Sequence, residues 1–184
     1  MKIILALGNP ERKFNFTRHN LGFFAADLFA KVHELEWAEN VRFKAITSTY
    51  KAGGDSILIV KPLTYYNLVG ETLGAVMRFY KVPVEDILVV CDDLSLPFGT
   101  VRTRLGGSDG GNNGLRSVIA QVGTEFKRVR IGTDNDMRAK MGDVDFVLAK
   151  FSEEEREELP EVLGKAIKLM GDFACGQFEA KKAH

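Results

Sequence analysis

An uninterrupted apolar run in the middle of the chain, Ile87 to Cys91, is the feature that most restricts the possible fold. A strand without any polar side chain is typical of a parallel sheet that helices cover on both faces. A second run at the start of the chain, Met1 to Leu7, is also mostly apolar and rich in β-formers. Both runs are therefore expected to be central strands of an α/β fold.

Segments with helical periodicity alternate with the predicted strands. Apolar residues recur at helical spacing over Leu21 to Leu35, Val69 to Tyr80 and Leu115 to Ile119. The other predicted strands are Lys44 to Ala52 and Ser56 to Lys61, which form a hairpin across Gly53-Gly54-Asp55, and then Val101 to Leu105 and Arg128 to Gly132. This alternation in 184 residues predicts one domain over residues 1–184, an α/β domain with a twisted, mixed and mostly parallel sheet flanked by helices.

The last third of the chain is predicted with less regular structure. The polar stretch Thr133 to Asp145 shows little structure of its own, and Phe146 to Leu148 is a short apolar piece. Ser152 to Glu155 has the pattern of a capping box, which predicts the start of a helix. Because proline removes a helical hydrogen bond, Pro160 is expected to split the following segment into a short and a long helix.

Composition argues against a protein of overall basic charge, a disulfide-rich protein and a membrane protein. Lys plus Arg and Asp plus Glu both total 25, so net charge gives no general attraction to nucleic acid, although five basic residues cluster locally (Arg102, Arg104, Lys127, Arg128 and Arg130). Two distant cysteines, Cys91 and Cys175, give neither a disulfide framework nor the spacing of metal ligands. No apolar run has membrane length or the form of a signal peptide, so we expect a cytoplasmic protein with reduced thiols.

Four polar loops could carry chemistry: Asn9 to His19, Tyr65 to Asn67, Asp92-Asp93, and Gly106 to Asn113. Loops that follow parallel strands meet at one edge of the sheet, where ligands bind in open α/β folds. A carboxylate that accepts from one imidazole nitrogen fixes the tautomer and leaves the other nitrogen as a base toward water. Since no serine or cysteine lies in a nucleophile-elbow pattern, activated water is favoured over a covalent intermediate.

Each of these loops also has a structural explanation. His19 could only begin a helix, Asp92-Asp93 could cap one, and Asn9 and Asn113 could be ordinary turn residues. The glycine-rich segment could be a flexible turn or a cradle for a phosphate. It lacks the ending of a P-loop, and Gly8 opens no dinucleotide fingerprint, so a nucleotide-dependent oxidoreductase is a poor alternative.

Together, the motifs resemble the bacterial-type peptidyl-tRNA hydrolases over nearly the whole chain, with the match fading after Gly132. The motifs that carry the resemblance are Leu7-Gly8-Asn9-Pro10, Thr17-Arg18-His19-Asn20-Leu21-Gly22, Lys61-Pro62-Leu63-Thr64 with Asn67 and Gly70, Asp92-Asp93-Leu94-Ser95-Leu96-Pro97 with Gly99, and Gly106-Gly107 through Gly110-Gly111 to Asn113-Gly114-Leu115-Arg116-Ser117.

The resemblance implies hydrolysis of the ester between peptide and tRNA, without a metal or cofactor. It implies that His19 is the general base, that Asp92 orients it, and that Asn113 positions water or stabilises the oxyanion. Asn9 would hold the peptide near the ester. The residues implied to contact the peptide are Asn67, Tyr66 and Phe14, and those implied to bind the tRNA acceptor stem are Arg102, Arg104 and Arg130. We expect a monomer whose partner is peptidyl-tRNA.

Several positions depart from the family pattern, although His19, Asp92, Asn9, Asn67 and Asn113 are not among them. Tyr66 stands where the family has Met, Asn112 stands where it has His, and Cys91 also replaces a His. Further departures are Glu11 for Gly, Phe14 for Tyr, and Thr133-Asp134-Asn135-Asp136 for an apolar segment with Gly and Pro. An alternative from another class is an inactive RNA-binding adaptor with the same fold, but such an adaptor would not need the complete His, Asp and Asn set.

Overall fold

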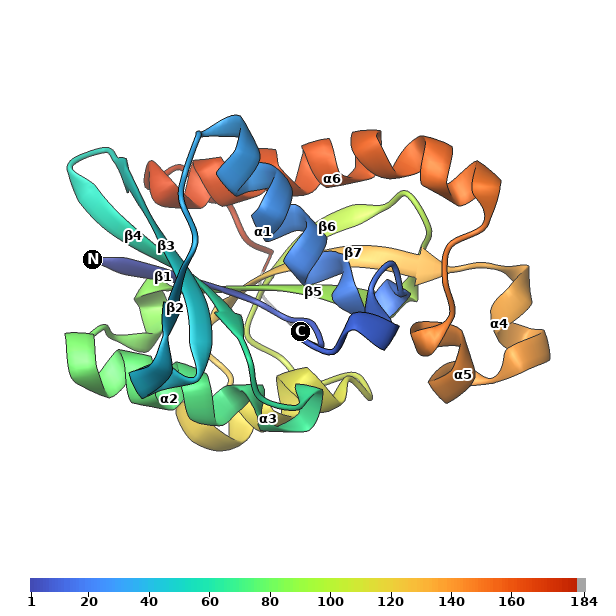
Figure 1. Cartoon of the computed structure of the whole chain (residues 1–184), viewed down its shortest axis with the longest axis horizontal. Helices are drawn as coiled ribbons and strands as arrows, with labels where there is room; N and C mark the ends of the chain where they lie inside the picture. Colours follow the sequence, from blue (N-terminus) through green and yellow to red (C-terminus); the bar gives the residue numbers. More distant parts are fainter. Residues whose placement is uncertain (182–184) are drawn as a thin grey trace.

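The two apolar runs form neighbouring parallel strands, β1 (Lys2–Ala6) and β5 (Ile87–Pro97), at the centre of a seven-stranded sheet in the computed structural model (Figure 1). The structure describes residues 1–181. The strand order is β2-β3-β4-β1-β5-β7-β6, in which β4, β1, β5 and β7 are parallel and the other pairs are antiparallel. The other strands are β2 (Ala38–Asn40), β3 (Ala45–Ala52), β4 (Asp55–Pro62), β6 (Val101–Leu105) and β7 (Lys127–Asp134). This confirms the predicted mixed, mostly parallel sheet.

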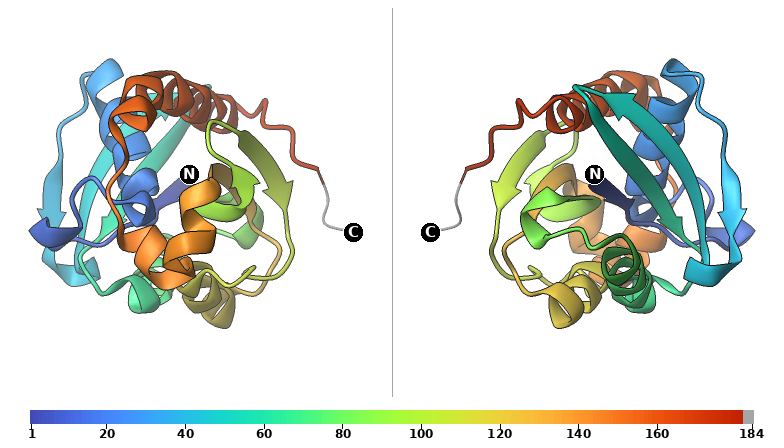
Figure 2. Two further views of the ribbon diagram at one scale, coloured as in Figure 1. Left: turned by 90° about the vertical axis from the view of Figure 1, so that its right-hand side faces the viewer. Right: turned by 90° about the vertical axis from the view of Figure 1, so that its left-hand side faces the viewer.

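Helices cover both faces of the sheet, as the apolar run in β5 predicts (Figure 2). Leu88 and Val90 pack in a core beneath α1 (Leu21–Val32) and α6 (Glu153–Ala174), whereas Ile87 and Val89 pack in a second core beneath α2 (Val69–Tyr80) and α3 (Asn113–Val122). Alternate residues of one strand therefore serve different layers.

The start of α1 lies unusually close to the carboxyl ends of β1 and β5. A Cβ atom on Gly22 would lie 2.4 Å from the backbone oxygen of Leu7 and 2.5 Å from that of Val90, so only glycine allows this approach. The short 3-10 turn Arg18–Asn20, which leads directly into α1, is thereby held at the same edge of the sheet.

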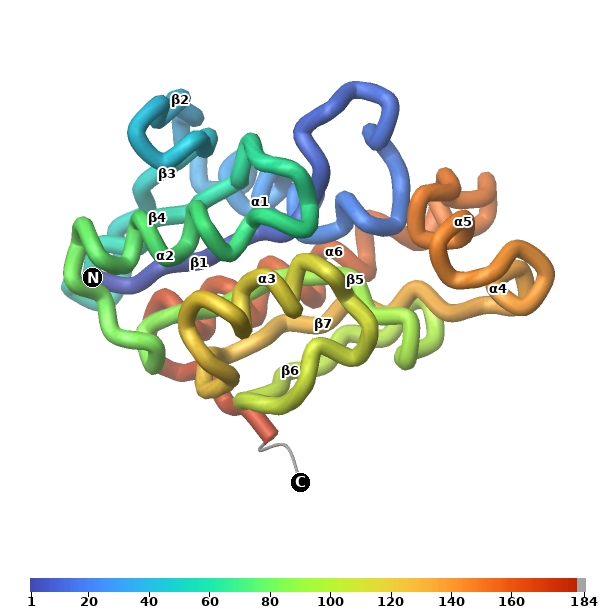
Figure 3. Tube along the Cα trace, turned by 90° about the horizontal axis from the view of Figure 1, so that it is seen from below, coloured from blue at the N-terminus to red at the C-terminus, as the bar shows by residue number. Residues whose placement is uncertain are grey.

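The segment after β7 contains more structure than the sequence indicates. Thr133 and Asp134 continue β7, and two short helices follow, α4 (Asp136–Met141) and α5 (Asp143–Leu148). Asn135 caps α4 by accepting a hydrogen bond from the backbone of Met137 (2.9 Å). The prediction of little structure was wrong because each helix is too short to show a clear apolar period. Seen from below, the two helices lie beyond one end of the sheet (Figure 3).

Pro160 does not divide the last helix. Residues Glu153–Ala174 form one continuous helix with Pro160 inside it, and the capping box of Ser152 and Glu155 is confirmed. Pro160 is exposed, so the carbonyl that loses its helical partner can be hydrated, while a buried stripe beginning at Val162 holds the helix on the sheet. Among residues 1–181, no helix is both long and apolar enough to cross a membrane.

Candidate functional site

The carboxyl ends of the parallel strands open into a cleft of about 520 Å³. All four predicted polar loops contribute to its wall, and α5 adds Val144, Val147 and Leu148. Its lining includes most residues singled out in the sequence, namely Asn9, Phe14, His19, Tyr66, Asn67, Asp92 and Asn113. Arg102, Arg104 and Arg130 do not line it. The topology therefore gathers the predicted chemistry in one place.

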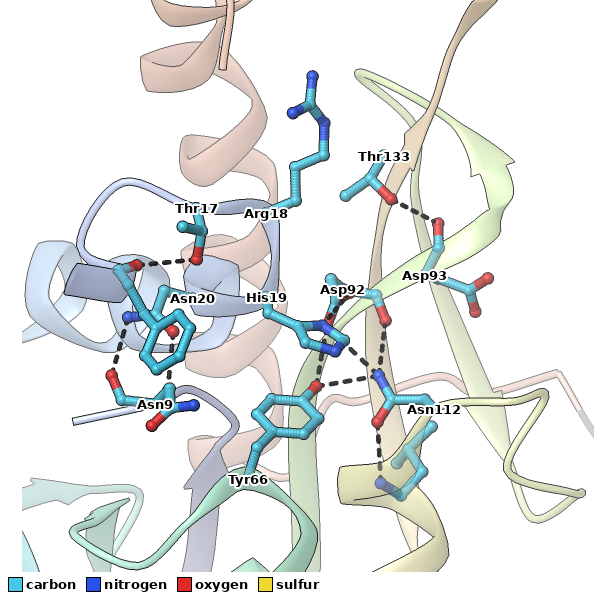
Figure 4. Close-up of polar contacts among 12 residues, drawn as sticks. Asn9, Thr17, Arg18, His19, Asn20, Tyr66, Asp92, Asp93, Asn112 and Thr133 are labelled. Carbon is cyan, nitrogen blue, oxygen red and sulfur yellow. Dashed lines mark hydrogen bonds and ion pairs between the residues drawn. The ribbon is translucent and has the colours of Figure 1, made fainter. Parts of the chain in front are cut away.

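His19 and Asp92 form a direct pair at the floor of this cleft (Figure 4). Nδ1 of His19 lies 2.7 Å from Oδ2 of Asp92, and the side chain of Asp92 is only 2% exposed. Because a carboxylate can only accept, the proton of a neutral imidazole lies on Nδ1 and the lone pair lies on Nε2. This is the arrangement of a base that acts on a substrate or on water.

The second oxygen of Asp92 is also held. Oδ1 accepts a hydrogen bond from the hydroxyl of Tyr66 at 2.9 Å and one from Nδ2 of Asn112 at 3.3 Å. The same Nδ2 donates to the Tyr66 hydroxyl at 3.0 Å, so the three side chains form a closed polar triangle. The sequence motifs did not assign a role to Asn112, although its position before a helix is a recognisable capping signal.

Tyr66 is buried, with 7% of its surface exposed, and its ring stacks on His19. The ring centroids are 4.1 Å apart and the planes differ by 14°. Burial, followed by the neighbouring carboxylate of Asp92, raises the pKa of Tyr66 well above its usual value. The phenol therefore remains protonated and able to donate at physiological pH.

Asn9 is fixed by its backbone rather than by its side chain. The side chain of Asn20 accepts from the backbone N–H of Asn9 at 2.8 Å and donates to its carbonyl at 3.1 Å. Oδ1 of Asn9 is buried and has no hydrogen-bond partner among residues 1–181. Since a buried polar atom without a partner is rare, this oxygen marks Asn9 as a residue of the cleft wall whose amide is not committed to the protein. Asn20 belongs to one of the sequence motifs but had no assigned role. Its position directly after His19 is the feature that could have identified it as a residue of the site.

Asn67, Asn113 and Phe14 line other parts of the cleft. Asn67 is exposed at the cleft side of a 3-10 turn before α2. Asn113 is the first residue of α3, and its Oδ1 accepts from Arg116 at 3.2 Å, which leaves the amide N–H₂ able to donate. Phe14 is half-buried and supplies an apolar surface.

Four arginines share one face of the β6–β7 edge of the sheet. Arg102 pairs with Arg130 and Arg104 pairs with Arg128 across the two antiparallel strands, so all four side chains leave the same face. Arg128 is buried and donates to the backbone carbonyls of Ser108 and Gly107, which supports the glycine-rich loop. The other three remain at least partly exposed.

Arg130 connects this basic face to the cleft. Its Nε lies 2.6 Å from Oδ2 of Asp93, and one of its terminal nitrogens donates to Oγ of Ser95 at 3.1 Å. Burial opposes ionisation of Asp93, but hydrogen bonds from Ser95 and Arg130 lower its pKa overall. The two consecutive aspartates thus have different tasks, since Asp92 contacts His19 and Asp93 holds an arginine.

A buried ion pair fixes the backbone immediately before His19. Arg18 donates to both carboxylate oxygens of Glu155, at 2.9 and 2.6 Å, and also to the carbonyls of Ala149 and Lys150. The side chains of Arg18 and Glu155 are 4% and 9% exposed. Since Glu155 also belongs to the capping box of α6, this pair joins the His19 turn to the last helix.

Comparison with known proteins gives a consistent result. Residues 3–183 match the sequence model of the peptidyl-tRNA hydrolase family. A peptidyl-tRNA hydrolase of Exiguobacterium sibiricum is 42% identical over 181 residues, covering 98% of this chain and 97% of the relative. One from Listeria monocytogenes is 38% identical over 179 residues, covering 97% and 95%. A crystal structure of peptidyl-tRNA hydrolase from Acinetobacter baumannii has a TM-score of 0.86 at 28% identity, covering 96% of this chain and 90% of that one.

Proposed function

Since this chain belongs to the peptidyl-tRNA hydrolase family, its activity is the hydrolysis of peptidyl-tRNA, and we propose that His19 is the general base of that reaction. The observation that carries this proposal is the 2.7 Å contact between His19 and Asp92 at the floor of the cleft. The inactive RNA-binding adaptor receives no support from the relatives, which are named as hydrolases.

The proposed reaction proceeds by direct attack of water on the ester. Nε2 of His19 takes a proton from water, and the oxygen of that water bonds to the ester carbonyl carbon. The tetrahedral oxyanion is stabilised by the amide of Asn113. When the intermediate collapses, the bond from carbon to the ribose oxygen breaks, and the imidazolium returns the proton to that oxygen. The products are free tRNA and a peptide carboxylate.

We propose that the neutral side-chain amides of Asn9 and Asn67 bind the peptide part of the substrate. Asn9 and Asn67 come from different loops that line the cleft and can hydrogen-bond a peptide backbone without regard to its side chains. Phe14 adds an apolar contact, and the ring edge of Tyr66 borders the same space. This combination suits a substrate that has a constant ester and a variable sequence.

Replacing Asp92 with asparagine is expected to slow hydrolysis by about 100-fold or more while tRNA binding persists. The carbonyl oxygen of the new amide would take over the hydrogen bonds from Tyr66 and Asn112, so its N–H₂ would face His19. Nδ1 would then have to accept, and the proton would move to Nε2, which is the wrong tautomer for a base. Steady-state release of the acyl group measures the effect, and Asp27→Asn, an exposed remote change, is the control. An unchanged rate would contradict the paired His and Asp.

We propose that the exposed arginines of the β6–β7 face bind the tRNA phosphates. Changing both Arg104 and Arg130 to glutamine is expected to weaken tRNA binding and to reduce the slope of log affinity against log salt by about 2, since each lost phosphate contact removes about 0.9. Arg42→Gln is the matched control because Arg42 packs on Phe79 outside this face. Binding measured at several salt concentrations gives the slope, and an unaltered slope would place the phosphate contacts elsewhere.

We further propose that the protein acts as a monomer in the cytoplasm. His19, Asp92 and Asn113, which carry the proposed reaction, belong to the same chain, so the reaction does not require a second copy, and both cysteines are free thiols. Gel filtration with light scattering tests the first point, and localisation of a tagged chain tests the second.

The activity itself is tested by incubating the purified protein with N-acetyl-aminoacyl-tRNA and a metal chelator. Release of the acyl group supports the proposed metal-independent hydrolysis. Binding of the intact substrate without release would contradict it and would return the adaptor to consideration.

A further inference from the structure

We propose that Tyr66 is a positioning residue for His19, acting through Asp92, and that Asn112 sets the direction of its hydroxyl hydrogen bond. The proposal deepens the proposed function, since it assumes that His19 is the base. It concerns two of the positions at which the chain departs from the family pattern, where Tyr stands for Met and Asn for His. The polar triangle of Tyr66, Asn112 and Asp92 is the observation on which it rests (Figure 4).

The direction of every hydrogen bond in this network follows from one backbone group. The N–H of Leu115 in the first turn of α3 donates to Oδ1 of Asn112 at 3.0 Å, which fixes the orientation of the amide. Nδ2 of Asn112 must therefore face Tyr66, whose oxygen accepts from it at 3.0 Å. The hydroxyl proton of Tyr66 is then directed to Oδ1 of Asp92.

This sequence of donors leaves one oxygen of Asp92 for His19. Because Oδ1 already accepts from Tyr66 and Asn112, the carboxylate cannot rotate without breaking two hydrogen bonds in a buried site. Oδ2 stays directed at Nδ1 of His19 at 2.7 Å. Tyr66 and Asn112 therefore fix the plane of the carboxylate, and with it the hydrogen bond to the imidazole.

The ring of Tyr66 holds the imidazole from a second direction. The two rings stack at 4.1 Å with nearly parallel planes, which restricts rotation of His19 about its side-chain bonds. The position of Tyr66 is itself fixed by α3, since a Cβ on Gly114 would lie 2.7 Å from the Tyr66 ring. A methionine at this position would offer neither a hydroxyl donor nor a flat ring.

The test compares Tyr66→Phe, which keeps the ring, with Asn112→Ser, which keeps a side chain able to cap α3. We expect each variant to lower kcat about tenfold, in line with the loss of one hydrogen bond to a charged group, and to leave KM unchanged. The double variant should be little slower than either single variant, because both act through the same oxygen of Asp92.

The second readout does not depend on turnover. The chain has three histidines, so nitrogen-15 NMR of labelled histidine can follow His19 directly. We expect the Nδ1–H proton of His19 to be protected from exchange with solvent in the parent, and to exchange about tenfold faster in Tyr66→Phe, because the carboxylate is then held less firmly. Tyr50→Phe is the matched control, because Tyr50 packs on a different histidine, His33, with ring centroids 4.5 Å apart.

An unchanged kcat with an unchanged exchange rate in folded Tyr66→Phe would overturn the proposal, as would a raised KM at constant kcat, which would make Tyr66 only a peptide contact. A lower kcat with an unchanged exchange rate of the His19 Nδ1–H proton would also contradict it. If the parent chain does not hydrolyse peptidyl-tRNA at all, the proposed function fails, and the NMR comparison still tests the positioning of His19.

Discussion

Replacing His19 with alanine is expected to slow hydrolysis of peptidyl-tRNA by about 10²–10⁴-fold, because a general base contributes an acceleration of that size. The side chain of His19 is partly exposed and its loss leaves the buried network of Tyr66, Asn112 and Asp92 in place. The fold should therefore persist, and tRNA binding should change little, since the basic face lies on β6 and β7, away from the His19 turn.

The measurement is single-turnover release of the acyl group at saturating enzyme, with tRNA affinity determined in parallel. His33→Gln is the matched control, because His33 is exposed and packs on Phe29 and Tyr50 away from the cleft. If His19→Ala retained the parent rate, His19 would have no part in the chemical step.

The largest expected effect on stability follows from Glu155→Gln. This change leaves the guanidinium of Arg18 buried without its carboxylate, and breaking a buried ion pair by removing one partner costs about 3–5 kcal/mol. Glutamine can still complete the capping box through its carbonyl oxygen, but its N–H₂ then faces the donors of Arg18 and Asn135, so a lost acceptor adds to the lost charge. Urea unfolding measures the free energy of unfolding. Turnover should also fall, because Arg18 fixes the backbone next to His19.

Glu154→Gln is the control for this prediction, since Glu154 lies in the same turn of α6 but is exposed. Its free energy of unfolding should change by less than about 0.5 kcal/mol. Equal stability of Glu155→Gln and the parent would show that the Arg18–Glu155 pair does not hold the two segments together.

Strong local patterns explain why much of the fold was predictable. The run Ile87 to Cys91 lies between two cores and could only be a central strand, and the Gly53-Gly54 turn does join two antiparallel strands. By contrast, α4 and α5 are too short for a periodic signal, and Pro160 is tolerated because tertiary packing of α6 outweighs one lost hydrogen bond.

In the candidate site, too, some contacts could be predicted from the sequence and others could not. The pairing of His19 with Asp92 could be expected from the family resemblance, and parallel strands do bring their loops to one edge of the sheet. The contacts of Tyr66 and Asn112 could not, since they depend on side-chain directions set by α3. The buried state of Arg128 was equally hidden, because alternation shows which face a residue occupies but not that a loop covers it.

Recognition of the peptide and hydrolysis of the ester are tested together by comparing kcat/KM for N-acetyl-aminoacyl-tRNA with kcat/KM for the same aminoacyl-tRNA unblocked, in the presence of a chelator. Only the blocked substrate carries an amide that the side chains of Asn9 and Asn67 can bind. We expect efficient release from the blocked ester and little from the unblocked one. Equal rates on both would contradict recognition of the peptide by these amides, and no release from either would contradict the activity.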